Sequence, residues 1–224
     1  MTDEEILTFL RTVPTFSGLD ESSLKYLARV SHIRRLHKGE VLFYQDDVGD
    51  AAYVVQNGVI DIVFTTADGR ELVINEMLVG DCFGELALIQ EEPRSAGAIA
   101  QEDSEVVWIP RREFMAGVES KPELMRQLLE TVANRLRSSG ERESALAFLD
   151  AATRLARLLI LRAAQEDESG DLVTISQEEL SRYIGVTRQT VAKILGQWRR
   201  RGWIITGRGR IMLVDLKALR QLAE

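Results

Sequence analysis

A glycine, a carboxylate and an arginine stand close together near the middle of the chain, in an arrangement suited to a phosphorylated sugar. Gly84 precedes Glu85, and Arg94 follows the carboxylate by nine residues. Glycine leaves the neighbouring backbone N–H groups uncrowded, so that they can cradle phosphate oxygens. A guanidinium can pair with the same oxygens through its planar fork, and a carboxylate can accept a hydrogen bond from a ribose 2′-hydroxyl. Residues 80–96 are therefore a candidate site for a cyclic phosphate-ribose.

The region around this candidate site has the pattern of short β-strands. From about Ile33 to Pro110, β-rich runs are separated by glycines that recur every 9 to 11 residues between positions 39 and 80. The Asp68-Gly69 pair lies between two apolar runs and is a strong hairpin signal. Regular short strands of this kind predict a barrel, a sandwich or a roll. Most of the glycines are expected to serve ordinary turns, whereas Gly84 is set apart by its place beside the candidate site.

Two short helices are predicted ahead of this β-rich region. Thr2 and Glu5 form a possible capping box for the first helix. The second is predicted from Asp20 to about Ser31, because its apolar residues recur on one side of a helix.

A long helix is predicted over residues 121–150. Ser120 and Glu123 have the spacing of a capping box, and a proline between them is tolerated in a first turn. One side of the helix carries a stripe whose members alternate in spacings of four and three: Met125, Leu129, Val132, Leu136, Ser139, Glu143 and Leu146. This pattern is typical of a short coiled coil and favours dimerisation over packing of the helix on its own domain. Glu143 is the unexpected member; it either destabilises the helix pair or pairs with Arg142 of a partner helix.

The C-terminal part has the layout of a helix-turn-helix motif. A helix over about 153–165 is followed by a predicted solvated loop over 166–171. Ser176 and Glu179 form the capping box of the next helix, Gly185 ends it, and Thr187 is suited to cap the helix that follows. That last helix has an apolar face and a polar face, and such a helix enters the major groove of DNA.

Basic side chains are concentrated in the same part of the chain. The net charge is −7, yet residues 182–210 contain eight basic side chains and no acidic one, so the other residues together carry −15. A positive face on an otherwise negative protein attracts and orients a polyanion. Residues 203–213 predict two short strands around a glycine-rich turn, which form a wing that brings Arg208 and Arg210 near DNA phosphates.

The composition excludes several other classes of protein. With 224 residues, of which 45% are hydrophobic and 28% charged, the chain resembles a globular protein of one large or two modest domains. It has no apolar run long enough for a transmembrane helix and no basic region of a secretory signal, so a cytoplasmic location without a membrane partner is expected. The lone Cys82 excludes an intrachain disulfide and a four-cysteine iron–sulfur cluster. The residues predict neither an enzyme nor a metal site.

Four runs of residues carry a resemblance to a known family. Residues 83–87 and 93–96 resemble the phosphate-binding cassette of cyclic-nucleotide-binding domains. Residues 146–150 resemble the end of a dimerisation helix, and residues 187–195 resemble a recognition helix. In this order, the parts resemble the CRP/FNR family of bacterial transcription regulators, closest in pattern to its cyclic-AMP receptor branch. The resemblance implies an α+β fold. It would have a cyclic-nucleotide-binding β-roll at 1–120, a dimerisation helix at 121–150 and a winged helix-turn-helix DNA-binding domain at 151–224.

The resemblance also implies roles in ligand binding. Gly84 and Glu85 would contact phosphate and the ribose 2′-hydroxyl, and Arg94 would neutralise the phosphate. The implied ligand residues are Ile62, Ile74, Gly84, Glu85, Leu86, Arg94, Ser95, Ala96, Ser139 and Gly140. Ser139 keeps the hydroxyl with which the family contacts the base, but Gly140 lacks one. Cyclic AMP is the implied effector, and cyclic GMP and cyclic di-GMP are alternatives, the second because of Gly140.

A corresponding set of residues is implied in DNA binding: Ser176, Thr187, Arg188, Gln189, Lys193, Arg208 and Arg210. Arg188 would contact guanine, and Gln189, which replaces a glutamate of the cyclic-AMP receptor branch, would favour adenine over cytosine as its partner base. The implied protein is a homodimer, joined through residues 121–150, that binds double-stranded palindromic DNA and contacts RNA polymerase.

Two other interpretations stay open on the same scaffold. In the first, Glu85 and Arg94 form a structural ion pair and the regulator needs no ligand. In the second, the protein senses haem or redox state through Cys82, His32 or His37, the only candidate ligands of that kind.

Overall fold

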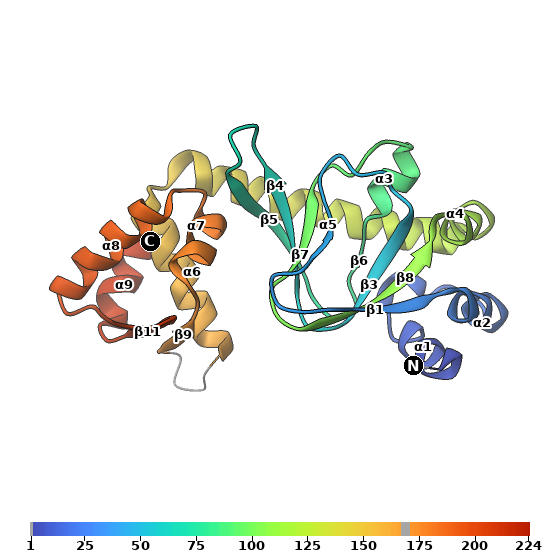
Figure 1. Ribbon diagram of the computed structural model, residues 1–224, viewed down its shortest axis with the longest axis horizontal. Helices are drawn as coiled ribbons and strands as arrows, with labels where there is room; N and C mark the ends of the chain where they lie inside the picture. The colour runs from blue at the N-terminus through green and yellow to red at the C-terminus, as the bar shows by residue number, and fades with distance from the viewer. Residues whose placement is uncertain (1, 167–170) are drawn as a thin grey trace. The chain divides into compact units, whose positions relative to one another are not determined.

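The computed structural model describes residues 2–166 and 171–224, apart from the side chains of residues 141 and 166. Most of the loop predicted at 166–171 therefore lies outside the described residues. The chain divides into two compact units (Figure 1). Unit 1 comprises residues 1–69 and 73–137, and unit 2 comprises residues 70–72 and 138–224. Among the described residues, no helix combines the length and the hydropathy that a membrane span requires.

Unit 1 is built on two four-stranded antiparallel sheets, which confirms the expected roll of short strands. Their orders are β1-β8-β3-β6 and β2-β7-β4-β5. The strands are β1 (His32–Leu36), β2 (Val41–Phe43), β3 (Ala51–Asn57), β4 (Ile60–Thr65), β5 (Glu71–Met77), β6 (Cys82–Phe83), β7 (Gly97–Ala100) and β8 (Ser104–Pro110). The Asp68-Gly69 pair lies between β4 and β5, which are neighbours in the second sheet, so the hairpin prediction is confirmed.

Strand β3 has both of its faces buried, because it separates two apolar clusters. Ala52 and Val54 face a cluster formed with the helices, whereas Tyr53 and Val55 face the cluster inside the roll. Successive side chains of a strand point to opposite faces, and a strand covered on both faces is therefore a continuous apolar run. The helices that cover the outer face include α1 (Asp3–Leu10), α2 (Glu21–Val30) and α4 (Arg111–Ser120) (Figure 1).

The caps of these helices confirm one sequence prediction and correct another. Thr2 and Glu5 form the capping box of α1, and Asp20 caps α2, as expected. Ser120, however, is the last residue of α4, a helix that the sequence pattern does not predict, and its hydroxyl donates to the carbonyl of Ala116. The predicted capping box of Ser120 and Glu123 is therefore wrong, because the serine is occupied by the preceding helix.

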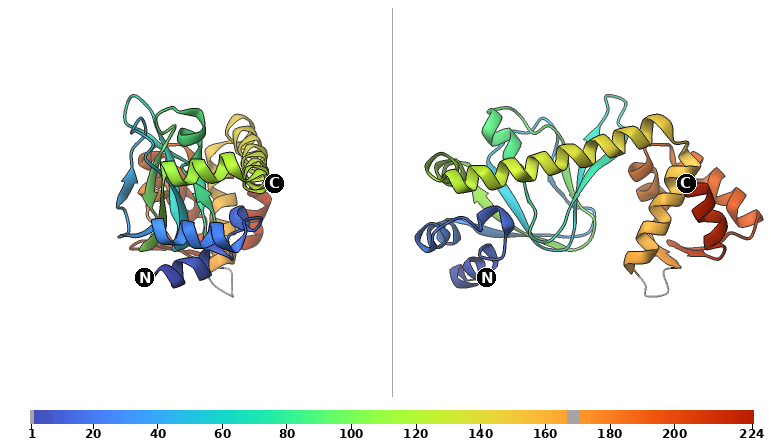
Figure 2. Two further views of the ribbon diagram at one scale, coloured as in Figure 1. Left: turned by 90° about the vertical axis from the view of Figure 1, so that its right-hand side faces the viewer. Right: turned by 180° about the vertical axis from the view of Figure 1, so that it is seen from behind.

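The long helix α5 (Pro122–Phe148) confirms the prediction for this segment and appears without a break in Figure 2. Leu124 and Leu128 are buried in the core of unit 1. Met125, Leu129 and Leu136 of the predicted stripe are 53%, 68% and 73% exposed. The helix therefore has one apolar face that is packed on its own unit and another that is open.

Unit 2 contains the elements α6 (Ala151–Glu166), β9 (Leu172–Thr174), α7 (Gln177–Ile184), α8 (Arg188–Arg200), β10 (Ile204–Gly207), β11 (Arg210–Leu213) and α9 (Leu216–Ala223). Its core includes Leu155, Leu159, Leu180, Trp198 and Leu219, all 2% exposed or less. The two predicted wing strands form an antiparallel pair, and β9 adds a third strand to them. The helices and the wing thus share one apolar core.

We expect the substitution Gly58→Ala to destabilise unit 1 strongly. Gly58 has a φ of +80°, and a Cβ atom there would lie 2.2 Å from the Ser104 hydroxyl oxygen and 2.8 Å from the Asp103 carbonyl oxygen. The variant would suffer both the left-handed backbone strain and the clash, at a cost of about 3 kcal/mol in the free energy of unfolding. Chemical denaturation followed by circular dichroism measures the loss.

Gly39→Ala is the matched control for this prediction. Gly39 has a φ of +83°, but a Cβ atom there would meet nothing within 4 Å. Gly39→Ala should therefore lower the free energy of unfolding only by the cost of the backbone strain, about 1 kcal/mol. Equal losses for the two variants would contradict the role assigned to the contact with Ser104.

Candidate functional site

The candidate phosphate site forms where β6 turns into the short helix α3 (Glu85–Gln90), which the sequence pattern does not predict. Gly84 makes the turn with a φ of +78°. A Cβ atom at this position would lie 2.8 Å from Nη1 of Arg94 and 3.2 Å from the ring of Tyr53. Both the backbone angle and the close approach of a cation therefore require glycine at this position.

Arg94 is buried in this site and is held from several directions. Its side chain is 2% exposed. Nη1 donates to the carbonyl of Gly84 at 2.7 Å, and Nη2 donates to the carbonyl of Ala51 at 2.8 Å and to Asp50 Oδ1 at 3.2 Å. The guanidinium carbon lies 4.3 Å from the centre of the Phe43 ring. These contacts compensate the charge for its loss of water, since a buried cation needs partners.

Glu85 is equally buried, and its partner is Arg135 of α5. The residue is 1% exposed, and its Oε1 accepts a hydrogen bond from Arg135 Nη1 at 2.9 Å. Arg135 also donates to the carbonyl of Cys82. Burial raises the pKa of the Glu85 carboxyl, although the charges of Arg135 and Arg94 oppose this shift. The side chain of Arg135 thus connects the long helix to the candidate site.

Two polar atoms of the site lack a hydrogen-bond partner among the described residues. They are Oε2 of Glu85 and Nε of Arg94, and both are buried. A buried donor or acceptor without a partner costs free energy, so each such atom requires an explanation. A ligand with a hydroxyl group for the acceptor and an anionic oxygen for the donor would satisfy both. The two side chains do not bond to each other but to Arg135 and Asp50, which differs from the mutual ion pair of the ligand-independent interpretation.

The remaining predicted ligand residues differ in their placement. The Arg94 segment is fixed by two backbone hydrogen bonds of 2.8 Å to Asp46 and Asp47, with Ser95 exposed and Ala96 buried. Leu86 is 40% exposed on α3. Ile62 packs partly against the core inside the roll, and Ile74 is 37% exposed. The structure therefore brings together residues 84–96, whereas Ser139 and Gly140 belong to unit 2 and their predicted contact with the ligand stays a prediction.

The helix-turn-helix prediction is confirmed in its local geometry. Ser176 and Glu179 form the capping box of α7, Gly185 ends that helix with a φ of +67°, and Thr187 caps α8. The apolar face of α8 is buried, whereas Arg188, Gln189 and Lys193 are exposed. The predicted base-contacting side chains are thus open to a large partner.

Arg154 is a structural residue of this unit that sequence reasoning missed. Its guanidinium donates to the carbonyl of Ile184 at 3.0 and 3.1 Å and to the carbonyl of Leu149. These carbonyls stand at the ends of α7 and α5, where intrahelical partners are lacking. Arg154 therefore fixes the first helix of the motif by its C-terminal end.

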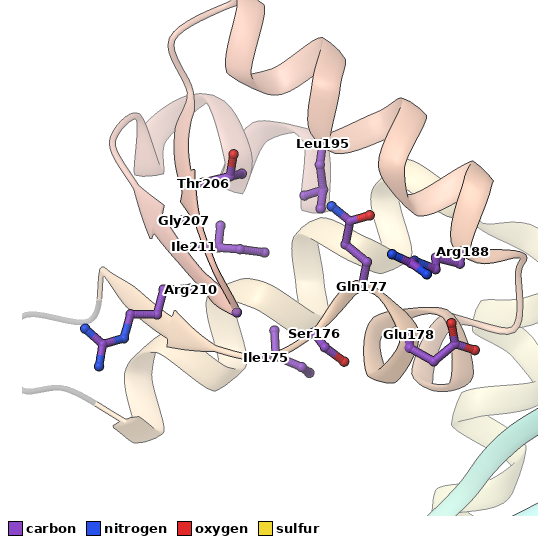
Figure 3. A pocket seen from close by; sticks show the side chains of 11 residues that line it. Ile175, Ser176, Gln177, Glu178, Arg188, Leu195, Thr206, Gly207, Arg210 and Ile211 are labelled. Atoms are coloured by element: carbon purple, nitrogen blue, oxygen red, sulfur yellow. The ribbon is translucent and has the colours of Figure 1, made fainter.

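A cavity of about 400 Å³ lies between α7, α8 and the wing (Figure 3). Ile175, Leu195 and Ile211 contribute apolar side chains to it, and its polar lining includes Ser176 and Gln177. In Figure 3, Arg188 extends toward Gln177, whereas Arg210 extends away from the cavity. The basic side chains Arg188 and Arg210 thus stand on two sides of a depression bordered by the wing, the helix α8 and the N-terminus of α7.

The candidate ligands for haem or redox chemistry are dispersed over unit 1. Cys82 is buried in β6, and burial raises the pKa of its thiol. His32 stacks on Trp108 in the paired strands β1 and β8. His37 is exposed, with Nδ1 3.6 Å from Asp103. Cys82 and His32 are thus packed within the β-strands, whereas His37 lies at the surface.

Comparisons with known proteins agree with this architecture. The family described as "Cyclic nucleotide-binding domain" matches residues 33–121, and the "Crp-like helix-turn-helix domain" matches residues 153–222. The "Cyclic AMP receptor protein" of Thermus thermophilus is 31% identical over 94% of this chain and 96% of its own length. The "CRP-like cAMP-activated global transcriptional regulator" of Mycobacterium tuberculosis is 30% identical over 93% and 96%.

A solved structure supports the same assignment. A CRP-family transcriptional regulator from Thermus thermophilus matches with a TM-score of 0.72 and 27% identity, over 85% of this chain and 96% of that chain. The two chains thus share a similar fold over most of their lengths. On these findings the chain belongs to the CRP/FNR family of transcription regulators.

Proposed function

We propose that this protein is a dimeric transcription regulator that binds cyclic AMP beside Arg94 and Glu85 and responds by binding a palindromic operator. The observation that carries the proposal is the pair of buried atoms without partners, Nε of Arg94 and Oε2 of Glu85. A cyclic phosphate supplies an acceptor for the first, and a ribose 2′-hydroxyl supplies a donor for the second.

Cyclic AMP is favoured as the effector by the names of two relatives that are 30% and 31% identical to this chain. Cyclic GMP has the same phosphate and ribose, so these atoms alone do not separate it from cyclic AMP. Gly140 supplies no side-chain hydroxyl for a base, and a Cβ atom there would meet nothing within 4 Å. Cyclic di-GMP, a larger ligand, is therefore the alternative that this position favours.

The proposed DNA contacts come from α8 and the wing. Arg188 and Lys193 are exposed near the N-terminal part of α8, and the wing carries Arg208 and Arg210. A bidentate arginine recognises guanine, and a glutamine at position 189 is suited to adenine. We assign base recognition to α8 and phosphate contacts to the wing and to the N-terminus of α7 at Ser176.

The proposed response is a shift between two states of a homodimer. The exposed stripe of α5 would pair with the same stripe of a second copy, and a two-fold dimer places its recognition helices about one DNA turn, roughly 34 Å, apart. A full shift from an inactive to an active population needs about 5.5 kcal/mol of differential binding, which two ligand sites can supply. Contact with RNA polymerase and action in the cytoplasm are parts of the same proposal.

A ligand-independent regulator is the second candidate, and one observation favours it. Arg94 already has a carboxylate partner in Asp50 and two carbonyl partners, so a large part of its charge is compensated in this structure. In that case Arg94 would only stabilise the roll.

The first test of the proposal is the loss of ligand binding in Arg94→Leu. The variant removes the charge-assisted hydrogen bonds to the phosphate, each contributing about 1.5–3 kcal/mol, so we expect cyclic AMP to bind at least about 100-fold more weakly. Isothermal titration with cyclic AMP, cyclic GMP and cyclic di-GMP measures this and identifies the ligand.

Arg111→Leu is the control for this test, because Arg111 is an arginine of the same unit that pairs with Glu91 at its surface. It should bind like the wild type. Undetectable binding of all three nucleotides by a folded wild type would support the ligand-independent candidate.

Arg188→Ala tests the proposed reading of bases. We expect a loss of about 1–3 kcal/mol on a cognate palindrome and a much smaller loss on random DNA, because a base contact contributes only at the right sequence. Fluorescence anisotropy with the two duplexes at one salt concentration measures both losses. Arg208→Ala should instead weaken both complexes equally and reduce the salt dependence, as a phosphate contact does. An equal loss on both duplexes for Arg188→Ala would exclude base recognition by this residue.

Leu136→Glu tests the proposed dimer. Leu136 is 73% exposed, so a carboxylate there costs the isolated subunit little, but in a helix pair it would be buried. We expect sedimentation to show a monomer at concentrations at which the wild type is a dimer. Arg137→Glu changes charge on the same turn at an exposed position off the stripe and should remain a dimer. A dimeric Leu136→Glu protein would place the interface elsewhere.

A further inference from the structure

Asp50 is a carboxylate that sequence reasoning did not single out, and it contacts the arginine of the candidate phosphate site. Its Oδ1 lies 3.2 Å from Nη2 of Arg94. The side chain of Arg94 is 2% exposed, whereas that of Asp50 is 65% exposed. The carboxylate thus reaches a buried guanidinium from the solvent, and it can leave the contact without losing access to water.

The other partners of Arg94 are different in kind. The carbonyl of Ala51 belongs to the first residue of β3, and the carbonyl of Gly84 belongs to the turn before α3. Both are neutral and fixed by the backbone. Among the contacts of the described residues, Asp50 is the one carboxylate bonded to Arg94, since Glu85 bonds to Arg135. Asp50 is therefore the partner that a ligand can displace.

A bound phosphate would compete with the present partners of Arg94 for the same N–H groups. An oxyanion that pairs with the side of a guanidinium takes Nε together with one N–H of Nη2. Nε of Arg94 has no partner in the described structure, but Nη2 donates to both Asp50 and Ala51. A bidentate phosphate therefore requires an N–H of Nη2, which already has two acceptors, and of these two the exposed carboxylate of Asp50 is the one that can move away.

We propose that Asp50 competes with the phosphate of the ligand for Arg94: the carboxylate pairs with the guanidinium in the protein without ligand and is displaced when the phosphate binds. This inference rests on the proposed function, because it assigns to the same site the residue that sets its affinity. Binding of the phosphate then contributes only the difference in free energy between the Arg94–phosphate pair and the Arg94–Asp50 pair. The affinity for the ligand is therefore lower than it would be if Arg94 had no carboxylate partner. The protein then responds to higher effector concentrations than it would without Asp50.

The test is the affinity of Asp50→Asn for cyclic AMP. Asparagine keeps the shape and an oxygen acceptor for Nη2 but removes the competing charge. Because water screens the charge of the exposed Asp50, we expect binding to tighten only about three- to tenfold in isothermal titration. Glu92→Gln is the matched control, since Glu92 is an exposed carboxylate two positions from Arg94 whose side chain forms no bond in the described structure. It should bind like the wild type.

The outcomes separate this inference from the proposed function. Unchanged or weaker binding by Asp50→Asn would overturn the inference, the weaker result because Asp50 would then position Arg94 rather than compete for it. Equal tightening in both variants would overturn it too, since only the overall charge would matter. If wild type binds no cyclic nucleotide, the proposed function fails, and inorganic phosphate becomes the probe. Asp50→Asn, but not Glu92→Gln, should then be stabilised more by phosphate in thermal unfolding, and no difference would overturn the inference.

Discussion

The burial of one positive charge, the guanidinium of Arg94, constrains most of the structure around it. A cation removed from water needs partners that compensate its charge. Here the carbonyl that opens β3, the carbonyl of Gly84 and the carboxylate of Asp50 take the hydrogen bonds, and Phe43 covers one face of the guanidinium. The turn at Gly84 excludes a side chain because its φ is +78° and a Cβ atom there would lie only 2.8 Å from Nη1 of the guanidinium. The burial of Arg94 thus accounts for the glycine at position 84, the position at which β3 begins and the aromatic ring at position 43.

A second ion pair, between the buried Glu85 and the half-buried Arg135, connects this site to the long helix. Glu85 opens α3, and Arg135 lies on α5, so their contact joins two elements 50 residues apart. Leu136 of the exposed stripe is the next residue of the same helix. A ligand that changes the partners of Glu85 acts on a side chain of that helix directly. The proposed response to ligand therefore needs no separate group of residues to connect the site to α5, the helix that we propose forms the dimer.

The sequence predicted best what depends on neighbours in the chain. The capping boxes at Thr2 and Ser176, the glycine at the end of α7 and the cap at Thr187 all form as expected. The capping box at Ser120 failed because an unrecognised helix, α4, already used that serine. Arg94 and Glu85 were found from their types and spacing. Their partners Asp50 and Arg135 were not, because an ion pair across 44 or 50 residues leaves no periodic signal.

The balance of charge in the site bears on the kind of anion that it accepts. In the described structure, two cations, Arg94 and Arg135, bond to two carboxylates, Asp50 and Glu85, so the group is neutral before a ligand arrives. A cyclic mononucleotide brings one negative charge, and the departure of the exposed Asp50 restores neutrality. A cyclic dinucleotide brings two, and the second would need a cation from outside this group. The same neutrality explains why Glu85 can stay buried beside a phosphate: Arg135 holds it, and Arg94 is left for the ligand.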